Sequence, residues 1–440
     1  DKVFENGAES SFLNSRWFVN GRCNIISNVI DKNLVDCSAK FAYIFEDEQG
    51  NVIRISFKEL DKQVNKVAAA LRSIGVKKGN VIGIFLPMIP EAIFSILACS
   101  KIGAVLCTLF SGYGSRALHS RLTDSNAGFL ITTNKMKRKG KLIDQQQTWL
   151  KAVEESNVSK VITVGESDHH SDNMLIGYND LLETSTETYC DTEVMDSEDP
   201  LFILYTSGTT GSPKGTIHVH GGFMVVAAQQ TAYTIDLFWY ADIGWITGQT
   251  WVVYGSPIVG GMALIYDGAL TYPQPYTWCD LISRHKVSIF GASPTAIRSF
   301  MSNDNYVKNY EFLSLRTLTV TGEPINKSAY LWYKKFVGKD RCPIINLSGG
   351  TEIGGAIVST SPLFSSKPCS VGKPLPGFDA TVFDESGNET SDGYLVIRKP
   401  WPSMTRGILN NRRKFFDTYW STNKNIWYHG DLVQIDSDGY

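Results

Sequence analysis

Short, continuous apolar runs alternate with amphipathic segments along most of this chain. The run at 81–86 reads Val-Ile-Gly-Ile-Phe-Leu, as expected for a strand that is buried on both faces of a sheet. Pro90 and Glu91 follow closely, and both residue types favour the first turn of a helix. Similar runs occur at 105–110, 128–132, 160–164, 201–204, 262–265, 287–290 and 315–320. This alternation predicts an α/β fold with mostly parallel sheets that are covered by helices.

The pattern changes after about residue 374. Short strands are expected at 379–383, 394–397 and 433–436, and polar turns that contain glycine separate the first two. We therefore expect α/β subdomains in residues 1–373 and a smaller, antiparallel β-rich subdomain in residues 374–440. The chain closes on Asp438-Gly439-Tyr440, and an Asp-Gly turn normally leads into another strand, so we expect more protein to follow.

Composition argues against several classes of function. The 440 residues carry 42 Lys and Arg against 44 Asp and Glu, which leaves no excess of positive charge to attract nucleic-acid phosphates. No apolar stretch is long enough to span a membrane, and no signal peptide is visible. The eight cysteines form no Cys-x-x-Cys pair, so we expect reduced thiols in a cytoplasmic protein.

The most informative segment is the loop at 205–215, Tyr-Thr-Ser-Gly-Thr-Thr-Gly-Ser-Pro-Lys-Gly. Its glycines let backbone N–H groups approach an anion, its hydroxyls add donors, and Lys214 adds a positive charge. This composition suits a polyphosphate. The loop is not a Walker A motif, because Pro213 stands where that motif needs glycine. A plain Ser/Thr/Gly linker between a strand and a helix is the alternative interpretation.

Four segments resemble, in the same order, the motifs of the adenylate-forming enzymes, which include acyl-CoA synthetases, luciferases and peptide-synthetase adenylation domains. The first is the loop at 205–215. The others are Thr321-Gly322-Glu323-Pro324 on the adenine side, Gly350-Thr351-Glu352 facing the phosphates, and Tyr428-His429-Gly430-Asp431, whose aspartate binds the ribose in that family.

The resemblance is closest to the acetyl-CoA synthetase and medium-chain acyl-CoA synthetase branch, for example at Gly244-Trp245-Ile246-Thr247-Gly248, and it covers essentially the whole chain. It implies the large N-terminal domain of that fold, with two sheets and a small β unit. The family's small C-terminal domain would then be absent from these 440 residues. Because that domain supplies residues to both reaction steps in the family, we expect this chain alone to bind ATP but to turn over poorly.

The family reaction joins a carboxylic acid to AMP at the expense of ATP, and then transfers the acyl group to CoA. The resemblance assigns catalytic roles to Thr206, Lys214, Thr351 and Glu352, with Glu352 as the Mg²⁺ ligand. It implies that ATP binds to Thr206, Ser207, Gly208, Thr209, Thr210, Gly211, Lys214, Gly322, Glu323, Pro324, Asn346, Leu347, Ser348, Gly349, Gly350, Thr351 and Asp431. His218 and His220 alternate without a third ligand nearby, which favours packing over a metal site.

For CoA, the segment Arg138-Lys139-Gly140-Lys141 resembles a basic segment that meets the nucleotide phosphates in the family; a solvated basic loop is the alternative. Thr247 and Thr271 are the other CoA candidates. Thr271 departs from the asparagine that is usual in the branch.

The acyl pocket is the most discriminating feature. The resemblance assigns it to Trp245, Ile246, Thr247, Thr321 and Gly349. Acetyl- and propionyl-CoA synthetases carry tryptophan where Gly349 stands, and a tryptophan buries roughly 150–250 Å². Its absence predicts a wider pocket for a short-to-medium-chain or hydroxylated acid, unless Trp245 or Trp251 refills the space. Thr321 adds a hydroxyl where valine is usual.

Three alternatives remain open at this point. The first is an acetyl- or propionyl-CoA synthetase whose pocket is compensated. The second is an enzyme that loads a carrier protein instead of CoA. The third, of a different class, is a nucleotide-binding module without catalysis. The partners expected are small molecules, and the oligomeric state is left open.

Overall fold

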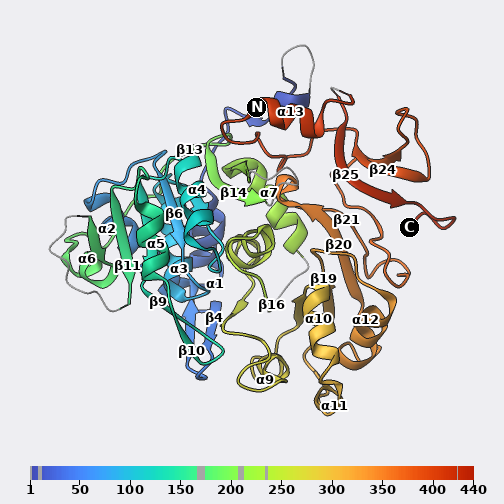
Figure 1. The fold of residues 1–440 in the computed structure, drawn as a ribbon, viewed down its shortest axis with the longest axis horizontal. Helices are drawn as coiled ribbons and strands as arrows, with labels where there is room; N and C mark the ends of the chain where they lie inside the picture. Colours follow the sequence, from blue (N-terminus) through green and yellow to red (C-terminus); the bar gives the residue numbers. More distant parts are fainter. Residues whose placement is uncertain (1, 8–11, 166–173, 207–212, 233–235, 424) are drawn as a thin grey trace.

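The computed structural model describes residues 2–7, 12–165, 174–206, 213–232, 236–423 and 425–440. Two large sheets dominate the described part of the chain, and smaller antiparallel sheets flank them (Figure 1). The fold class predicted from the sequence is confirmed.

The first large sheet has the order β12-β11-β8-β6-β7-β14-β15. All neighbours are parallel except the β14–β15 pair at one edge. The strands are β6 (Val81–Phe85), β7 (Val105–Thr108), β8 (Phe129–Thr133), β11 (Lys160–Val164), β12 (Leu175–Gly177), β14 (Pro200–Thr206) and β15 (Lys214–Val219). The helices that belong to this half are α2 (Phe57–Ser73), α3 (Pro90–Lys101), α4 (Ser115–Asp124), α5 (Gln146–Val153) and α6 (Tyr178–Thr184).

The second large sheet has the order β22-β21-β20-β19-β18-β16-β17-β4-β5. It is parallel from β20 to β4 and antiparallel at both edges. The strands are β4 (Phe41–Asp47), β5 (Val52–Ser56), β16 (Leu237–Trp239), β17 (Ala263–Asp267), β18 (Ile289–Ala292), β19 (Thr317–Val320), β20 (Ile344–Gly350), β21 (Gly355–Ser359) and β22 (Lys373–Pro374). The accompanying helical segments are η3 (Ser27–Asp31), α1 (Lys32–Cys37), α7 (His220–Thr231), η4 (Gly248–Gly255), α8 (Ser256–Ile258), α9 (Thr277–Arg284), α10 (Pro294–Met301), α11 (Asp304–Val307), α12 (Lys327–Trp332), η5 (Tyr333–Val337) and η6 (Thr351–Ile353).

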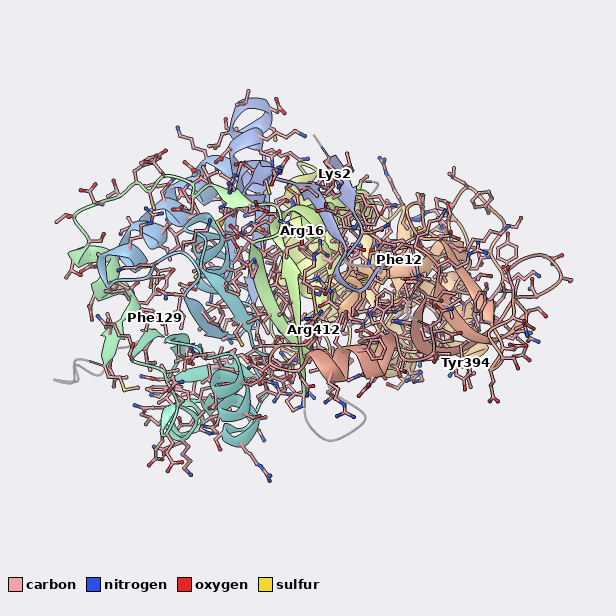
Figure 2. The ribbon with its side chains drawn as sticks, turned by 90° about the horizontal axis from the view of Figure 1, so that it is seen from above. Lys2, Phe12, Arg16, Phe129, Tyr394 and Arg412 are labelled. Atoms are coloured by element: carbon pink, nitrogen blue, oxygen red, sulfur yellow. The ribbon has the colours of Figure 1, made fainter. Side chains whose placement is uncertain are left out.

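The C-terminal part forms a three-stranded antiparallel sheet, whose order is β23-β24-β25, and the helix α13 (Arg412–Tyr419). Its strands are β23 (Ala380–Phe383), β24 (Asp392–Ile397) and β25 (Trp427–Gln434). Figure 2 shows Phe129 of the first large sheet and Tyr394 of this small sheet toward opposite ends of the molecule. The remaining small elements are β1 (Lys2–Glu5), η2 (Phe12–Asn14), β2 (Arg16–Val19), β3 (Arg22–Cys23), β9 (Lys135–Arg138), β10 (Lys141–Asp144) and β13 (Met195–Asp196).

One strand differs from the sequence prediction in a way that matters for the site. The expected strand at 433–436 is the end of a longer strand, β25, which begins at Trp427 and contains the whole Tyr428–Asp431 motif. Trp427 is buried against the ring of Tyr419, with centroids 4.0 Å apart, and this contact fixes the start of the strand. The motif therefore lies on a paired strand rather than in a loop.

The two large sheets share one apolar core. A single cluster contains Leu60 of α2 and Ile82 of β6 together with Tyr43 of β4, Trp239 of β16 and Trp251 of η4. Burial of this cluster, at roughly 25 cal/mol per Å² of apolar surface, joins the halves into one body. All eight cysteines are free, as predicted.

None of the helices in the described ranges combines the length and apolar character needed to cross a membrane.

Candidate active site

A cavity of about 730 Å³ opens where the parallel strands of the second large sheet end. Trp239, Asp267, Thr321 and Gly349 lie at or just beyond the carboxyl ends of β16, β17, β19 and β20, and all four line it. Segments of the first half, including Phe110 and Arg138, complete the wall. Ligand sites of open α/β sheets form at this edge because the strand ends and their following loops converge there.

The stem of the predicted phosphate loop lies at the ends of β14 and β15. Thr206 and Lys214 are Cα partners in this antiparallel pair. The alternative interpretation places a linker between a strand and a helix, but residues 214–219 form a strand before α7 begins. The candidate residues Ser207, Gly208, Thr209, Thr210 and Gly211 lie outside the described residues.

Lys214 and Glu352 meet at the ring of Tyr419. The Lys214 Nζ lies 5.4 Å from the centre of that ring, and the Glu352 carboxylate lies near enough to the Tyr419 hydroxyl to contribute to its raised pKa. Burial, and then the negative charge of Glu352, raise the pKa of Tyr419, so the phenol stays a neutral donor. Burial lowers the pKa of Lys214, and Glu352 opposes that shift. A cation and an anion thus lie together beside the phosphate-loop stem.

Two contacts hold the turn that carries Thr351 and Glu352. The Nε2 of His218 lies 2.8 Å from the Thr351 carbonyl oxygen. Burial lowers the pKa of His218 to about 3, so the ring is neutral and its Nε2–H donates. The Thr405 N–H donates to the Glu352 carbonyl oxygen at 2.9 Å, and the Thr405 hydroxyl accepts from the Ile217 N–H at 3.0 Å. Strand β15 and the turn therefore form one unit.

His429 lies between the two acidic residues of the predicted nucleotide site. Its Nδ1 is 3.7 Å from Oε1 of Glu352, and its Nε2 is 3.6 Å from Oδ2 of Asp431. The Glu352 side chain is only 14% exposed, whereas that of Asp431 is 52% exposed. Strand β25 thus brings Asp431 next to Glu352 while leaving its carboxylate accessible to a ligand.

The adenine-side candidates divide into two groups. Gly322, Gly349, Gly350 and Thr351 line the cavity. The candidates that are not in its described lining are Glu323, Pro324, Asn346, Leu347 and Ser348.

Two of these outlying side chains already have protein partners. The Glu323 carboxylate accepts from the Thr295 N–H at 2.7 Å, and the Asn346 side-chain amide donates to the Ser370 carbonyl oxygen at 2.9 Å. The amide nitrogen of Asn346 thus holds a neighbouring loop.

All five acyl-pocket candidates line the same cavity: Trp245, Ile246, Thr247, Thr321 and Gly349. The Thr321 hydroxyl donates to the Leu347 carbonyl oxygen at 2.8 Å. Its proton is therefore engaged by the backbone, and only its oxygen lone pairs can serve a ligand.

Gly349 faces protein backbone instead of open space. A Cβ at this position would lie 2.1 Å from the Gly355 carbonyl oxygen and 2.5 Å from the Ala356 Cα, because β20 and β21 approach closely at a register shift. The absence of a side chain here is thus required by strand packing, and it does not by itself open a channel.

Two buried tryptophans line the cavity in addition to Trp245. Trp239 and Trp251 are both buried, and their ring centroids lie 4.9 Å apart. Trp251 is one of the two aromatic residues considered for refilling the space. The other, Trp245, is 42% exposed and packs against Phe110. Sequence reasoning missed Trp239, because a tryptophan within a short apolar run carries no local sign that it borders a cavity.

Two of the six CoA candidates, Arg138 and Thr247, line the cavity. Lys139 and Gly140 form the tip of the β9–β10 hairpin, and Lys141 is exposed beyond it. Thr271 is half-buried outside the described lining and directly precedes Tyr272, whose hydroxyl lies where a Cβ of Gly140 would be.

Two carboxylates in the lining were not anticipated. Burial raises the pKa of Asp267 to about 6, against the opposing effect of Arg138. Burial also raises the pKa of Asp242, although the carboxylate accepts from the Gly244 N–H and the Ser111 hydroxyl. Asp267 is the last residue of β17 and Asp242 follows the end of β16, and that position is the signal by which the sequence could have indicated them.

The donor set at Glu352 fits Mg²⁺ that is held mainly by a substrate. No group of three or more His, Cys, Asp or Glu suited to a metal occurs among the described residues. One carboxylate next to the lining residue Thr351 agrees with Mg²⁺, which binds through one or two carboxylates together with phosphate oxygens and water. His218 and His220 are both buried in packing contacts, as expected.

Comparison with known proteins agrees with this geometry. The model of a family described as AMP-binding enzyme matches residues 32–409. The acetyl-coenzyme A synthetase of Methanothrix thermoacetophila is 39% identical over 446 aligned positions, which cover 97% of this chain and 68% of that protein. The corresponding protein of Chlorobaculum tepidum is 38% identical, with 97% and 67% covered.

A solved structure, acetoacetyl-CoA synthetase from Streptomyces lividans, shares the fold with a TM-score of 0.88 at 24% identity, and the match covers 100% of this chain and 69% of that one. Fold and site together define an α/β enzyme of the adenylate-forming class. The chain belongs to the AMP-binding enzyme family, among the AMP-forming acyl-CoA synthetases, which are acid–thiol ligases.

Proposed function

We propose that this chain activates a short-to-medium-chain carboxylic acid, longer than acetate, as an acyl-adenylate and passes the acyl group to CoA. One observation carries the proposal: a single cavity reaches Thr351 beside Glu352, the apolar wall at Trp239 and Trp251, and the cationic hairpin at Arg138. The three co-substrates of such a reaction need these three environments within one space.

The first step brings a carboxylate to the α-phosphate of ATP, so charge neutralisation and alignment dominate its barrier. Lys214 and the hydroxyl-rich loop would bind the phosphates, and Thr351 would add a donor. Glu352 would hold Mg²⁺, which when bound neutralises phosphate oxygens. Asp431 would accept hydrogen bonds from the ribose hydroxyls. The Tyr419 hydroxyl lies near the Glu352 carboxylate.

The size of the acid follows from the apolar part of the cavity. Each additional buried methylene contributes about 0.8 kcal/mol, so three or four would favour a longer acid by about two orders of magnitude. Trp239 and Trp251 supply buried aromatic surface to this part. The Thr321 oxygen could also accept a hydrogen bond from the hydroxyl of a hydroxylated acid, so both classes of acid belong in the test.

An ATP–pyrophosphate exchange assay over acids of increasing length tests the proposal. We expect an optimum at about four to eight carbons. A sharp optimum at acetate would instead identify an acetyl-CoA synthetase. The relatives that are 37–39% identical to this chain carry that name. A 3-hydroxy acid run in parallel distinguishes the hydroxylated class.

Two further outcomes separate the remaining alternatives. If a preformed acyl-adenylate releases AMP with a carrier protein but not with CoA, the chain belongs to a carrier-loading enzyme. If ATP binds but no acid supports exchange in the full-length protein, the site is a nucleotide-binding module without catalysis.

A further inference from the structure

A buried carboxylate outside the cavity fastens three separate segments together. Glu48 follows β4 and is only 6% exposed. Its Oε1 accepts from the Lys139 N–H at 2.8 Å and from the Ala269 N–H at 2.9 Å, and its Oε2 accepts from the Gly140 N–H at 2.8 Å. These donors are 91, 221 and 92 residues away in the sequence. Glu48 does not belong to the catalytic residues or to the nucleotide-binding residues described above.

The hairpin that Glu48 holds has a tight two-residue turn. Arg138 pairs with Lys141, and the residues between them, Lys139 and Gly140, have φ values of +51° and +70°. Two successive left-handed residues direct their N–H groups to one side of the turn, where the Glu48 carboxylate lies. On the other side a Cβ at Gly140 would lie 2.2 Å from the Tyr272 hydroxyl. Glu48 thus holds the tip on one side and Tyr272 limits it on the other, although Lys139 and Gly140 themselves stay exposed.

The hairpin carries two cations into the cavity wall. Lys137 and Arg138 both line the cavity. The Arg138 Nη2 donates to the Tyr240 hydroxyl at 2.6 Å, and that hydroxyl donates to the Gly268 carbonyl oxygen at 2.7 Å. Gly268 precedes Ala269, one of the donors to Glu48, so the guanidinium and the carboxylate are anchored to the same short loop.

We propose that Glu48 is a positioning residue for the phosphate-bearing co-substrate: it fixes the hairpin so that Lys137 and Arg138 meet the anionic groups of CoA at the cavity entrance. The proposal rests on the proposed function. Glu48 itself does not contact the ligand. Its three hydrogen bonds hold the hairpin turn before CoA binds. The entropic cost of ordering that turn on binding is therefore smaller.

The test compares Glu48→Gln with Asp47→Asn in the full-length protein. Asp47 is the adjacent acid and also accepts three N–H bonds, but all come from Gln49 and Asn51 of its own turn. Calorimetric titration with CoA and, separately, with MgATP measures the two affinities. We expect Glu48→Gln to weaken CoA binding about tenfold or more and to leave MgATP affinity within about twofold, and Asp47→Asn to change neither.

Hydrogen–deuterium exchange of the free protein provides a second measurement that needs no ligand. Protection of the Lys139 and Gly140 amides should fall in Glu48→Gln and persist in Asp47→Asn. Unchanged CoA affinity, unchanged protection, or an equal loss of CoA and ATP affinity would each overturn the role assigned to Glu48. If the wild-type protein supports no pyrophosphate exchange and binds no CoA, the proposed function is wrong. Hydrogen–deuterium exchange would still show whether Glu48 holds the turn at Lys139 and Gly140.

Discussion

At the scale of single residues, the same residue type can be required for opposite reasons. Gly349 was expected to leave room for substrate, yet its missing side chain makes room for the neighbouring strand. No sequence pattern distinguishes these cases, because both require only that a Cβ be absent. Glu352 and Asp431, in contrast, were found from their motifs, and the structure brings both within 4 Å of His429.

Substitution of Gly349 should therefore act on stability. We expect Gly349→Ala to lower the free energy of unfolding by about 1–3 kcal/mol, because the new Cβ would collide with the backbone of β21. Denaturant unfolding measures this change. Gly128→Ala is the matched control, since its Cβ would meet nothing within 4 Å and should cost no more than about 0.5 kcal/mol. Equal stabilities of the two variants would contradict the close approach of β20 and β21.

A buried histidine should make stability depend on pH. Burial lowers the pKa of His220 to about 3, so below the ordinary value near 6.5 the unfolded chain binds a proton that the folded chain does not. His220 should contribute no pH dependence above pH 6.5 and a loss of about 1.4 kcal/mol per pH unit as the pH drops from 6.5 toward 4, and His218, whose pKa burial also lowers to about 3, should add a similar loss. Thermal unfolding of wild type and His220→Gln across this range measures the effect. The variant should show the smaller slope, and parallel curves would reject the assignment.

At the scale of elements, continuous apolar runs identified the strands that are buried on both faces, and β6 and β11 agree closely with the predicted ranges. The strand prediction failed where contacts with other segments, and not the residue's own sequence pattern, determine the strand. Strand β15 contains Thr216 and His218, both buried and polar, so no apolar run marked it. The beginning of β25 was missed for a related reason, because aromatic packing against α13 fixes it.

The element that ends the apolar pocket can be tested through Trp251 of η4. We expect Trp251→Phe to shift the optimal acid in pyrophosphate exchange toward longer chains, by about one or two carbons, because a smaller ring leaves space beside Trp239. Trp278→Phe provides the control: Trp278 is also fully buried but packs against Phe290 and Phe300 away from the cavity lining. It should lose stability without changing acid preference. If both variants keep the wild-type optimum, Trp251 does not limit the pocket.

At the scale of the whole molecule, the site forms where segments of the two large sheets meet. Thr321 and Gly349 belong to the second sheet or directly follow its strands, whereas Thr206 and Lys214 belong to the edge pair of the first. The rule that parallel strands present their carboxyl ends together predicts that Thr321 and Gly349 lie close together, because both lie at strand ends of one sheet. The contacts of Glu48 with the β9–β10 hairpin and the raised pKa values of Asp242 and Asp267 were not predictable. They depend on contacts between segments that share no sequence pattern.

Loss of the acid at the phosphate end should affect the first reaction step most. We expect Glu352→Gln in the full-length protein to reduce ATP–pyrophosphate exchange by about two orders of magnitude, because a neutral amide holds Mg²⁺ poorly. Glu323→Gln is the control, since Glu323 is not among the described lining residues and its carboxylate already accepts hydrogen bonds from Thr295 and Arg298. Similar losses in both variants would argue against a specific role for Glu352.

The tryptophans that bound the substrate space belong to the same apolar cluster that joins the two large sheets. Substrate preference and folding are therefore coupled in this molecule. Natural or selected variants that accept bulkier acids because smaller residues replace these tryptophans should have lower thermal stability. We expect such variants to persist only alongside compensating substitutions elsewhere in the shared core.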